Sequence, residues 1–206
     1  MYVPIENIFS NYRDCITPDG CMYEFGVCTG NSIYTIIQES YKYNKEFKYI
    51  YGFDSFEGLP SEKDGVWCNP DWKPGVFNVV NEFGLDSKQE AINKLYEKWN
   101  YNNSVFLYDG WFKDVLTDKL AESLKDNKAT FLHIDTDLYI SAYEALDWMF
   151  TKNMVAKGCL IRYDDWFSTP LWTAGESRAH MEIQQKHNLK FLPVNDNLYM
   201  YLGKND

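Results

Sequence analysis

Two pairs of aspartates in this 206-residue sequence are spaced so that they could lie together at the ligand-binding edge of a sheet. Asp135 and Asp137 end an apolar run that begins at Phe131, and they are expected to emerge together because alternate side chains of a strand share one face. Asp164 and Asp165 end a second run after about one helix length of chain. Parallel neighbouring strands end at the same sheet edge, where open α/β sheets bind their ligands. The sequence therefore predicts four carboxylates at one edge of a sheet.

Four carboxylates at one edge would repel one another unless something neutralised them. Mg²⁺ or Mn²⁺ would resolve the repulsion, because hard cations take oxygen ligands and leave positions open for water or substrate. The alternative is that these acids cap the helices that follow, since aspartate is a favoured N-cap. Capping explains any single aspartate equally well, whereas two acidic pairs at adjacent strand ends favour a metal or ligand site.

The strands that would carry these acids alternate with helices along the chain. Strands are predicted at residues 21–27, 48–53, 104–108, 129–134 and 158–163, and helices at 5–16, 33–43, 86–99, 112–125, 141–150 and 175–187. Two last strands, 190–194 and 198–202, are joined by Asn195-Asp196-Asn197, which favours a hairpin turn. We expect an α/β protein with a Rossmann-like, mostly parallel seven-stranded sheet, helices on both faces and a carboxyl-terminal antiparallel hairpin.

Between residues 55 and 81 the periodicity is lost, and the chain becomes rich in glycine, proline and aromatic residues. A loop of this length in a compact domain is usually a lid or a binding loop. A chain of this size suits one domain with a substantial core. We therefore expect residues 1–206 to form a single domain, with a helical segment at 1–20 and a lid-like loop at 55–81.

A second group of candidate residues follows the first predicted strand. Glu24 precedes Gly26 and Gly30 in the turn that leads to the next helix, and Asp54 ends the second strand. Glycine lets the backbone approach a ligand closely, and Glu24 can accept hydrogen bonds from an amine or a hydroxyl. Asp54 lies where Rossmann-like folds hold a ribose diol. Each glycine alone could serve only a turn, but together these residues favour a nucleoside-bearing cofactor.

The glycine turn distinguishes between two such cofactors. The pyrophosphate of NAD needs a Gly-x-Gly-x-x-Gly turn at the start of a helix. Here residues 27–29 separate Gly26 from Gly30 without a middle glycine, so a cofactor without phosphates fits better. S-adenosylmethionine has a ribose diol, an adenine and an amino-acid tail, and a terminal hairpin on a parallel sheet is typical of the class I methyltransferases that use it.

Several motifs occur in one order between about residues 21 and 180. The most specific is Gly52-Phe53-Asp54-Ser55-Phe56-Glu57-Gly58-Leu59-Pro60, and the others are Glu24-Phe25-Gly26-Val27 with Gly30-Asn31-Ser32, Gly110-Trp111-Phe112, Ile134-Asp135-Thr136-Asp137-Leu138-Tyr139 and Asp164-Asp165-Trp166. In this order they resemble the macrocin O-methyltransferase family, which includes macrolide-sugar and aminocoumarin O-methyltransferases. The resemblance implies Mg²⁺-dependent transfer of a methyl group from S-adenosylmethionine to a hydroxyl of a sugar or glycosylated natural product.

The resemblance also implies roles for individual residues. Asp135, Asp164 and Asp165 match metal ligands, and Asp137 matches a proposed general base. The positions that match cofactor-binding residues are Glu24, Gly26, Gly30, Ser32, Asp54, Ser55, Asp109, Gly110, Trp111, Phe112 and Asp135. Of these, Asp109 to Phe112 would border the adenine.

Three side chains near the acids have alternative interpretations. Asp137 could take the proton of the attacked hydroxyl or could cap the next helix, and both roles remain open. His133 lies deeper on the strand that leads to Asp135 and is interpreted as a core histidine with a hydrogen-bond partner. His180 is interpreted either as an alternative base or as a surface residue.

Composition narrows the partners and the location. The net charge of −10 disfavours nucleic acid and anionic membranes as partners. The five cysteines are odd in number and lack a Cys-x-x-Cys pair, which is typical of reduced thiols. The sequence shows neither a signal-peptide pattern at its start nor an apolar run of membrane-spanning length. We expect a soluble cytoplasmic protein that acts on a small-molecule acceptor with hydroxyl groups and could form a homo-oligomer.

Two other classes of function remain open on the sequence alone. One is a non-catalytic cofactor-binding or scaffold protein with the same fold, and the presence of all four acids argues against it. The other is a metal-dependent hydrolase that uses the acid cluster. Binding of the cofactor would separate a methyltransferase from a scaffold that does not bind it and from the hydrolase.

Overall fold

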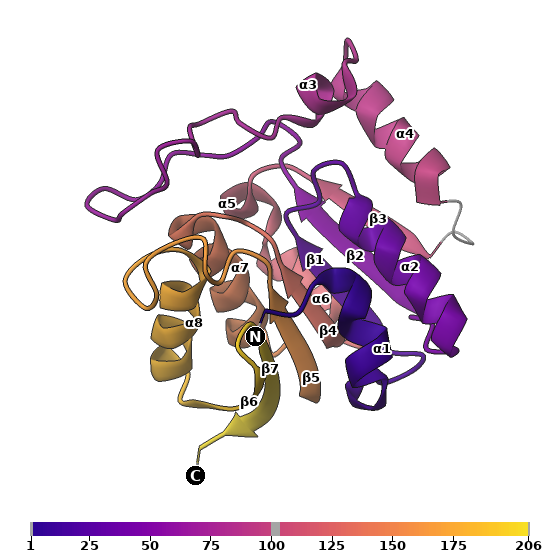
Figure 1. Cartoon of the computed structure of the whole chain (residues 1–206), viewed down its shortest axis with the longest axis vertical. Helices are drawn as coiled ribbons and strands as arrows, with labels where there is room; N and C mark the ends of the chain where they lie inside the picture. Colours follow the sequence, from indigo (N-terminus) through magenta and orange to yellow (C-terminus); the bar gives the residue numbers. More distant parts are fainter. Residues whose placement is uncertain (1, 100–103, 206) are drawn as a thin grey trace.

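Seven strands form one sheet in the computed structural model, which describes residues 2–99 and 104–205 (Figure 1). Their order across the sheet is β3-β2-β1-β4-β5-β7-β6. The strands are β1 (Cys21–Phe25), β2 (Tyr49–Asp54), β3 (Val105–Asp109), β4 (Ala129–Ile134), β5 (Val155–Tyr163), β6 (Leu189–Asn195) and β7 (Leu198–Lys204). β1 to β5 pair in parallel, and β7 is antiparallel to both β5 and β6. The predicted sheet with its carboxyl-terminal hairpin is confirmed.

Helices cover both faces of the sheet, as the sequence predicts (Figure 1). They are α1 (Ile8–Tyr12), α2 (Asn31–Tyr43), α3 (Val79–Phe83), α4 (Lys88–Trp99), α5 (Phe112–Val115), α6 (Asp118–Leu124), α7 (Tyr139–Thr151) and α8 (Gly175–Lys186). Side chains alternate along a strand, so Met22 of β1 joins a core with α1, α2 and α4, while Tyr23 joins a second core with α6, α7 and α8. Within the described ranges, no helix has both the length and the apolar character needed to cross a bilayer.

The single helix predicted at residues 112–125 is wrong, because the structure divides it into α5 and α6. Leu116 leaves the helical conformation, with φ −80° and ψ 63°. Thr117 then caps α6, and its hydroxyl accepts a hydrogen bond from the N–H of Leu120. Threonine is a good N-cap, so this local start signal outweighs the apolar periodicity that runs through it.

Two other predicted segments differ in part from the structure. The helix predicted at residues 5–16 consists of α1 flanked by 3-10 turns at Ile5–Asn7 and Arg13–Cys15. Residues 55–78, all of which the structure describes, contain no helix or strand. Asn78 then caps α3. A lid function for this loop and the single-domain organisation of the whole chain stay predictions.

Gly26 lies where β1 leaves the sheet beside the end of β4. Its φ is 87°, and a Cβ at this position would lie 1.6 Å from the carbonyl oxygen of Asp135. Asp135 is held there because its N–H donates to the carbonyl oxygen of Phe25 at 2.9 Å. The approach of two chain segments therefore requires this glycine, independently of any ligand.

Gly26→Ala is expected to lower the free energy of unfolding by more than about 2 kcal/mol, because a left-handed conformation alone costs an alanine roughly 1–2 kcal/mol. Displacement of the Asp135 backbone adds to that cost. Urea unfolding measures the loss, with Gly65→Ala as the control. Gly65 has a φ of 78°, but its Cβ would meet no described atom within 4 Å. Equal losses in the two variants would show that the contact with Asp135 is unimportant.

Candidate active site

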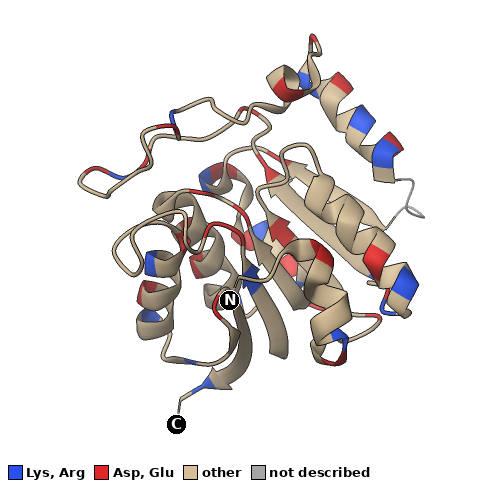
Figure 2. Cartoon of the chain, viewed as in Figure 1, with Lys and Arg blue, Asp and Glu red and all other residues tan. Residues whose placement is uncertain are grey.

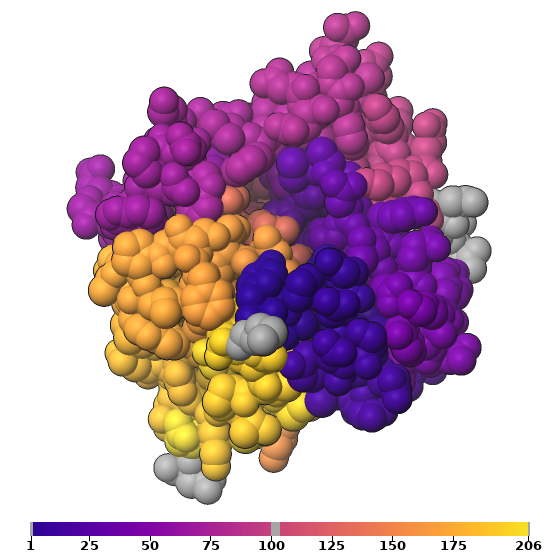
Figure 3. Space-filling model, viewed as in Figure 1, coloured from indigo at the N-terminus to yellow at the C-terminus, as the bar shows by residue number. Residues whose placement is uncertain are grey.

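A cavity of about 780 Å³ opens at the carboxyl ends of the parallel strands. In Figure 3 the surface is hollowed between the purple loop of residues 55–78 and the orange segment that follows β5. The predicted site residues that line the cavity are Gly26, Asp54, Ser55, Gly110, Trp111, Phe112, Asp135, Asp137, Asp164 and Asp165. The predicted residues that do not line it are Glu24, Gly30, Ser32 and Asp109.

Glu24 belongs to β1, and it is 0% exposed. Its Oε1 accepts a hydrogen bond from the hydroxyl of Ser32 at 2.6 Å, whereas Oε2 has no partner among the residues that the structure describes. Burial raises the pKa of Glu24 well above its usual range, although the Ser32 bond opposes this shift. A buried acceptor without a donor costs about 1–3 kcal/mol, so Glu24 fits a ligand that brings an amine or a hydroxyl.

Asp54 holds the glycine turn in place. Its Oδ2 accepts hydrogen bonds from the N–H groups of Val27 and Cys28 at 2.7 and 2.8 Å, and Oδ1 accepts from the N–H of Phe56 at 2.6 Å. An ionised carboxylate offers about four acceptor positions, so these bonds leave capacity for a ligand hydroxyl. The structure therefore adds a loop-fixing role to the ribose role that the sequence predicts.

Gly30 and Asp109 have partners away from the cavity. Gly30 is the N-cap of α2 with φ 65°, and a Cβ there would lie 2.5 Å from the ring of Trp99. The indole N–H of Trp99 also donates to the carbonyl oxygen of Gly30 at 3.0 Å. The carboxylate of Asp109 forms an ion pair with Lys88 at 2.9 Å. Cofactor roles for Gly30 and Asp109 stay predictions.

All four predicted acids line the cavity, but the predicted reason for their alignment is wrong. β4 ends at Ile134, before either aspartate, so a shared strand face does not align Asp135 with Asp137. Asp137 instead has a φ of 59°, a left-handed conformation at the turn into α7. Figure 2 shows acidic residues in the loops that follow β4 and β5. The acids thus converge through loop geometry rather than through the two-residue period of a strand.

Glu62, rather than Asp137, caps the start of α7. The N–H groups of Tyr139 and Ile140 donate to the two carboxylate oxygens of Glu62 at 2.7 and 3.0 Å. A carboxylate is favourable at this end of a helix because of the helix dipole. Glu62 belongs to the long loop after β2, so this contact fastens the loop to the opposite side of the cavity. Asp137 therefore does not cap α7, which was one of the two roles that the sequence left open for it.

The carboxyl groups of Asp137 and Asp165 both line the cavity and lie close enough to influence each other's pKa. Burial, followed by the charges of Asp165 and Asp135, raises the pKa of Asp137 far above its usual range. Burial also raises the pKa of Asp165, although the hydroxyl of Ser168 donates to it at 2.7 Å and opposes the shift. This crowded, all-oxygen donor set fits Mg²⁺ or Mn²⁺.

Asp164 differs from the other acids because a buried arginine balances its charge. Arg162 is 1% exposed, and its Nη1 lies 2.7 Å from Oδ1 of Asp164. The hydroxyl of Tyr2 accepts from Nη2 of Arg162 at 2.7 Å and donates to the same Asp164 oxygen at 3.0 Å. Burial acts to raise the pKa of Asp164, but Arg162, His133 and Tyr2 together outweigh it and hold that pKa below its usual range. The sequence pattern did not single out Arg162 or Tyr2.

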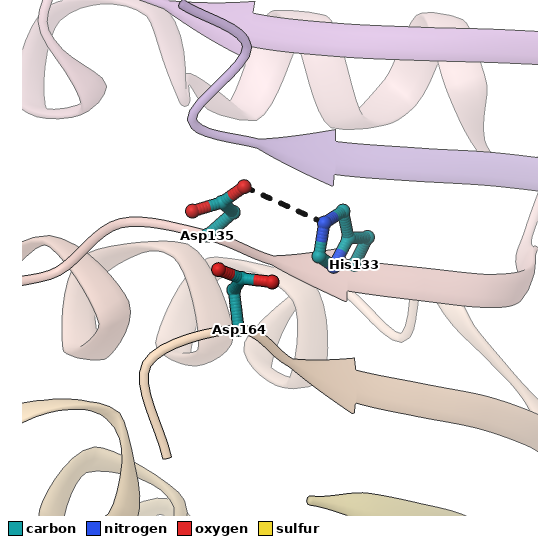
Figure 4. A group of neighbouring side chains, drawn as sticks. All are labelled: His133, Asp135 and Asp164. Atoms are coloured by element: carbon teal, nitrogen blue, oxygen red, sulfur yellow. Dashed lines mark ion pairs between the residues drawn. The ribbon is translucent and has the colours of Figure 1, made fainter. Parts of the chain in front are cut away.

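His133 is a buried residue, as the sequence predicts. Its Nε2 lies 3.6 Å from Oδ2 of Asp135 (Figure 4). Together with Asp164 these two residues could offer three metal-ligand atoms within 4.8 Å of one another. However, Nη1 of Arg162 lies 3.4 Å from both ring nitrogens of His133. The guanidinium therefore already occupies the surroundings of the ring, and the carboxylates remain the better ligands.

His180 is neither of the two things that the sequence suggested. It is buried, so it is not a surface residue, and it does not line the cavity, so it is not placed to act as a base. Its Nδ1 is hydrogen-bonded to the hydroxyl of Tyr163 at 2.8 Å, and its ring packs against Trp166 and Tyr199. Burial lowers the pKa of His180 to about 3.

Glu176 is a further buried acid beside the site that the sequence pattern did not reveal. It lies in the first turn of α8, where an acid ordinarily complements the helix dipole. Here the side chain is 0% exposed, and its two oxygens accept hydrogen bonds from the N–H groups of Thr136 and Asp165. No local signal distinguishes this contact from ordinary helix-end chemistry.

A parallel sheet that ends in an antiparallel hairpin, with a cavity at the carboxyl ends of its strands, defines a class I methyltransferase fold. The chain belongs to the macrocin O-methyltransferase (TylF) family, whose family model matches residues 10–191. The resemblance found in the sequence motifs is confirmed.

Solved structures share the fold at low sequence identity. CalS11, a calicheamicin methyltransferase, has a TM-score of 0.70 and 22% identity over 98% of this chain and 79% of its own. The O-methyltransferase NovP has a TM-score of 0.65 and 19% identity over 98% of this chain and 78% of its own. The methyltransferase PaMTH1 of Podospora anserina, bound to SAH, has a TM-score of 0.51 and 12% identity over 98% of this chain and 76% of its own. No curated protein sequence matches the chain.

Proposed function

We propose that this protein transfers the methyl group of S-adenosylmethionine to a hydroxyl of a sugar or a glycosylated natural product, with the help of a divalent cation. The observation that carries the proposal is the convergence of the glycine turn, Asp54 and four carboxylates on one cavity. Family membership supports O-methyl transfer. CalS11 is described as a TDP-rhamnose 3′-O-methyltransferase, which supports a sugar acceptor.

Asp135, Asp164 and Asp165 are the residues that would hold the cation. All three offer carboxylate oxygens at the cavity wall, and such ligands suit Mg²⁺ and Mn²⁺. The charges of Asp165, Asp135 and Asp164 act together to raise the pKa of Asp137, and a cation beside these carboxylates would relieve their repulsion. The ion pair with Arg162 engages only one oxygen of Asp164 and leaves the other for a ligand.

When bound, the cation supplies a Lewis acid for the acceptor oxygen, and the sulfonium cofactor supplies the methyl group. Asp137 would remove the proton of the attacked hydroxyl as a general base, which would leave the oxygen free to accept the methyl group. Burial and the neighbouring carboxylates raise the pKa of Asp137, and positive charge placed beside it would lower that pKa. Trp111 and Phe112 form an apolar part of the cavity wall, and Asp54 keeps the glycine turn in register for the cofactor.

Binding of S-adenosylmethionine and of its demethylated product tests the proposal. Glu24→Gln is expected to weaken cofactor binding by about 10–100-fold, because a hydrogen bond to a charged group contributes about 1.5–3 kcal/mol. Calorimetry measures both affinities, with Glu90→Gln, an exposed glutamate of α4, as the control.

If neither ligand produces heat with the wild type, the methyltransferase proposal fails. If the wild type binds and Glu24→Gln binds equally well, only the role of Glu24 is wrong. The same titration separates a methyltransferase from a hydrolase that uses the acid cluster.

A further inference from the structure

One buried side chain connects the two loops that carry the acids. Oε1 of Glu176 accepts a hydrogen bond from the N–H of Thr136 at 3.1 Å, and Oε2 accepts from the N–H of Asp165 at 2.9 Å. Thr136 lies between Asp135 and Asp137 in the loop after β4, and Asp165 lies in the loop after β5. A single carboxylate from α8 therefore spans both halves of the acidic edge.

The helix turn that carries Glu176 is itself well anchored. The hydroxyl of Ser177 accepts a hydrogen bond from the N–H of Trp172 at 2.8 Å. Gly175 has φ 55°, and a Cβ there would lie 2.4 Å from the hydroxyl oxygen of Thr169. The loop between β5 and α8 thus packs closely against the first turn of α8. Glu176 reaches the acidic loops from a fixed position rather than from a mobile segment.

A carboxyl group suits this place because both of its bonds come from backbone N–H donors, so both oxygens act as acceptors. A glutamine amide could accept only one of the two in the same geometry. The side chain is 0% exposed and lies beside the acidic loops, where a further acid adds to the repulsion among the carboxyl groups. A cation at the edge would offset that repulsion.

We propose that Glu176 is a positioning residue that sets the separation of the two acidic loops before the cation binds. The sheet side of each loop is fixed by a backbone bond, from Asp135 N–H to the Phe25 carbonyl and from Asp164 N–H to the Ile134 carbonyl, both at 2.9 Å. Glu176 fixes the opposite side. The inference rests on the proposed function, because it assigns Glu176 to the support of the metal ligands.

Titration of the metal-free full-length protein with Mn²⁺ tests this role. Glu176→Gln keeps the shape of the side chain, but its amide NH₂ cannot accept one of the two N–H bonds. Groups that orient metal ligands typically contribute about 10–100-fold to metal affinity, and a loss of that size is expected here. The affinity for S-adenosylmethionine should not change, because Asp54 and the glycine turn lie on other strands. Glu182→Gln is the matched control, since Glu182 is on the same helix and binds Tyr139 and Arg178 instead.

A measurement on the wild type keeps the inference testable if the variant does not fold. The amide protons of Thr136 and Asp165 should exchange slowly in the metal-free protein, and adding Mg²⁺ should not slow them further. Amides that become protected only after Mg²⁺ is added would overturn the inference, as would a folded Glu176→Gln with wild-type Mn²⁺ affinity. A wild type that binds S-adenosylmethionine but no Mn²⁺ would refute the metal part of the proposed function and this inference with it.

Discussion

Asp137→Asn is expected to lower the rate constant for methyl transfer by about 10²–10⁴-fold, the usual contribution of a general base. The substitution removes the carboxylate that would accept the proton and nearly preserves the shape of the side chain. Because Glu62 caps α7, the change should not weaken that helix. Cofactor and metal affinity should be almost unchanged. Single-turnover kinetics with a labelled methyl donor, over a panel of sugar acceptors, measures the rate constant.

The matched control is Asp64→Asn, which removes an exposed carboxylate from the loop after β2. It should leave the rate constant unchanged. If Asp137→Asn also keeps near wild-type turnover, Asp137 is not the base. Excess Mg²⁺ should not restore the variant, and restoration would instead identify Asp137 as a metal ligand. His180 could not replace it as the base, because His180 is buried among aromatic rings outside the cavity.

Removal of the divalent cation by exhaustive chelation is expected to abolish turnover, and Mg²⁺ should restore it. Asp165→Asn should reproduce much of this loss, and excess Mg²⁺ should partly rescue it, because a weakened ligand set can still be filled at high concentration. Metal-dependent activity curves for wild type and variant provide the measurement. Full turnover after chelation would show that the acids serve another purpose.

Asp164→Asn would also test the metal site, but less directly than Asp165→Asn. Its carboxylate is the charged partner of Arg162, a side chain that is 1% exposed. Removing one partner of a buried pair leaves an uncompensated charge, so the variant should lose thermal stability as well as metal affinity. Within the part of the chain that the structure describes, Asp165 has no such buried arginine partner. Its substitution therefore separates metal binding from folding more cleanly.

The parts of the fold that the sequence predicted depend on local patterns. The apolar run of β4 predicted its bounds correctly, and the Asn195-Asp196-Asn197 turn correctly predicted the hairpin between β6 and β7. Apolar periodicity did not predict the break at Leu116, because the capping hydroxyl of Thr117 ends one helix and starts another within a continuous pattern. Local start signals can thus outweigh periodicity.

Two of the residues that the sequence missed act over long separations in the chain. Tyr2 reaches Asp164 across 162 positions, and Glu62 reaches Tyr139 across 77. Neither contact leaves a periodic or motif signal, because each depends on how the loops close over the sheet. Gly26 is a similar case. A side chain is excluded at this position because it would meet the carbonyl oxygen of Asp135, a residue that is distant in the sequence.

The most direct test of the account is a calorimetric titration of the metal-free, cofactor-loaded protein with Mn²⁺. The account predicts binding of a single ion per chain in the wild type and loss of that binding in an Asp135→Asn, Asp165→Asn double variant whose melting temperature shows that it is folded. Absence of any binding heat in the wild type, or equal binding in the double variant, would contradict the assignment of the acidic edge as a metal site.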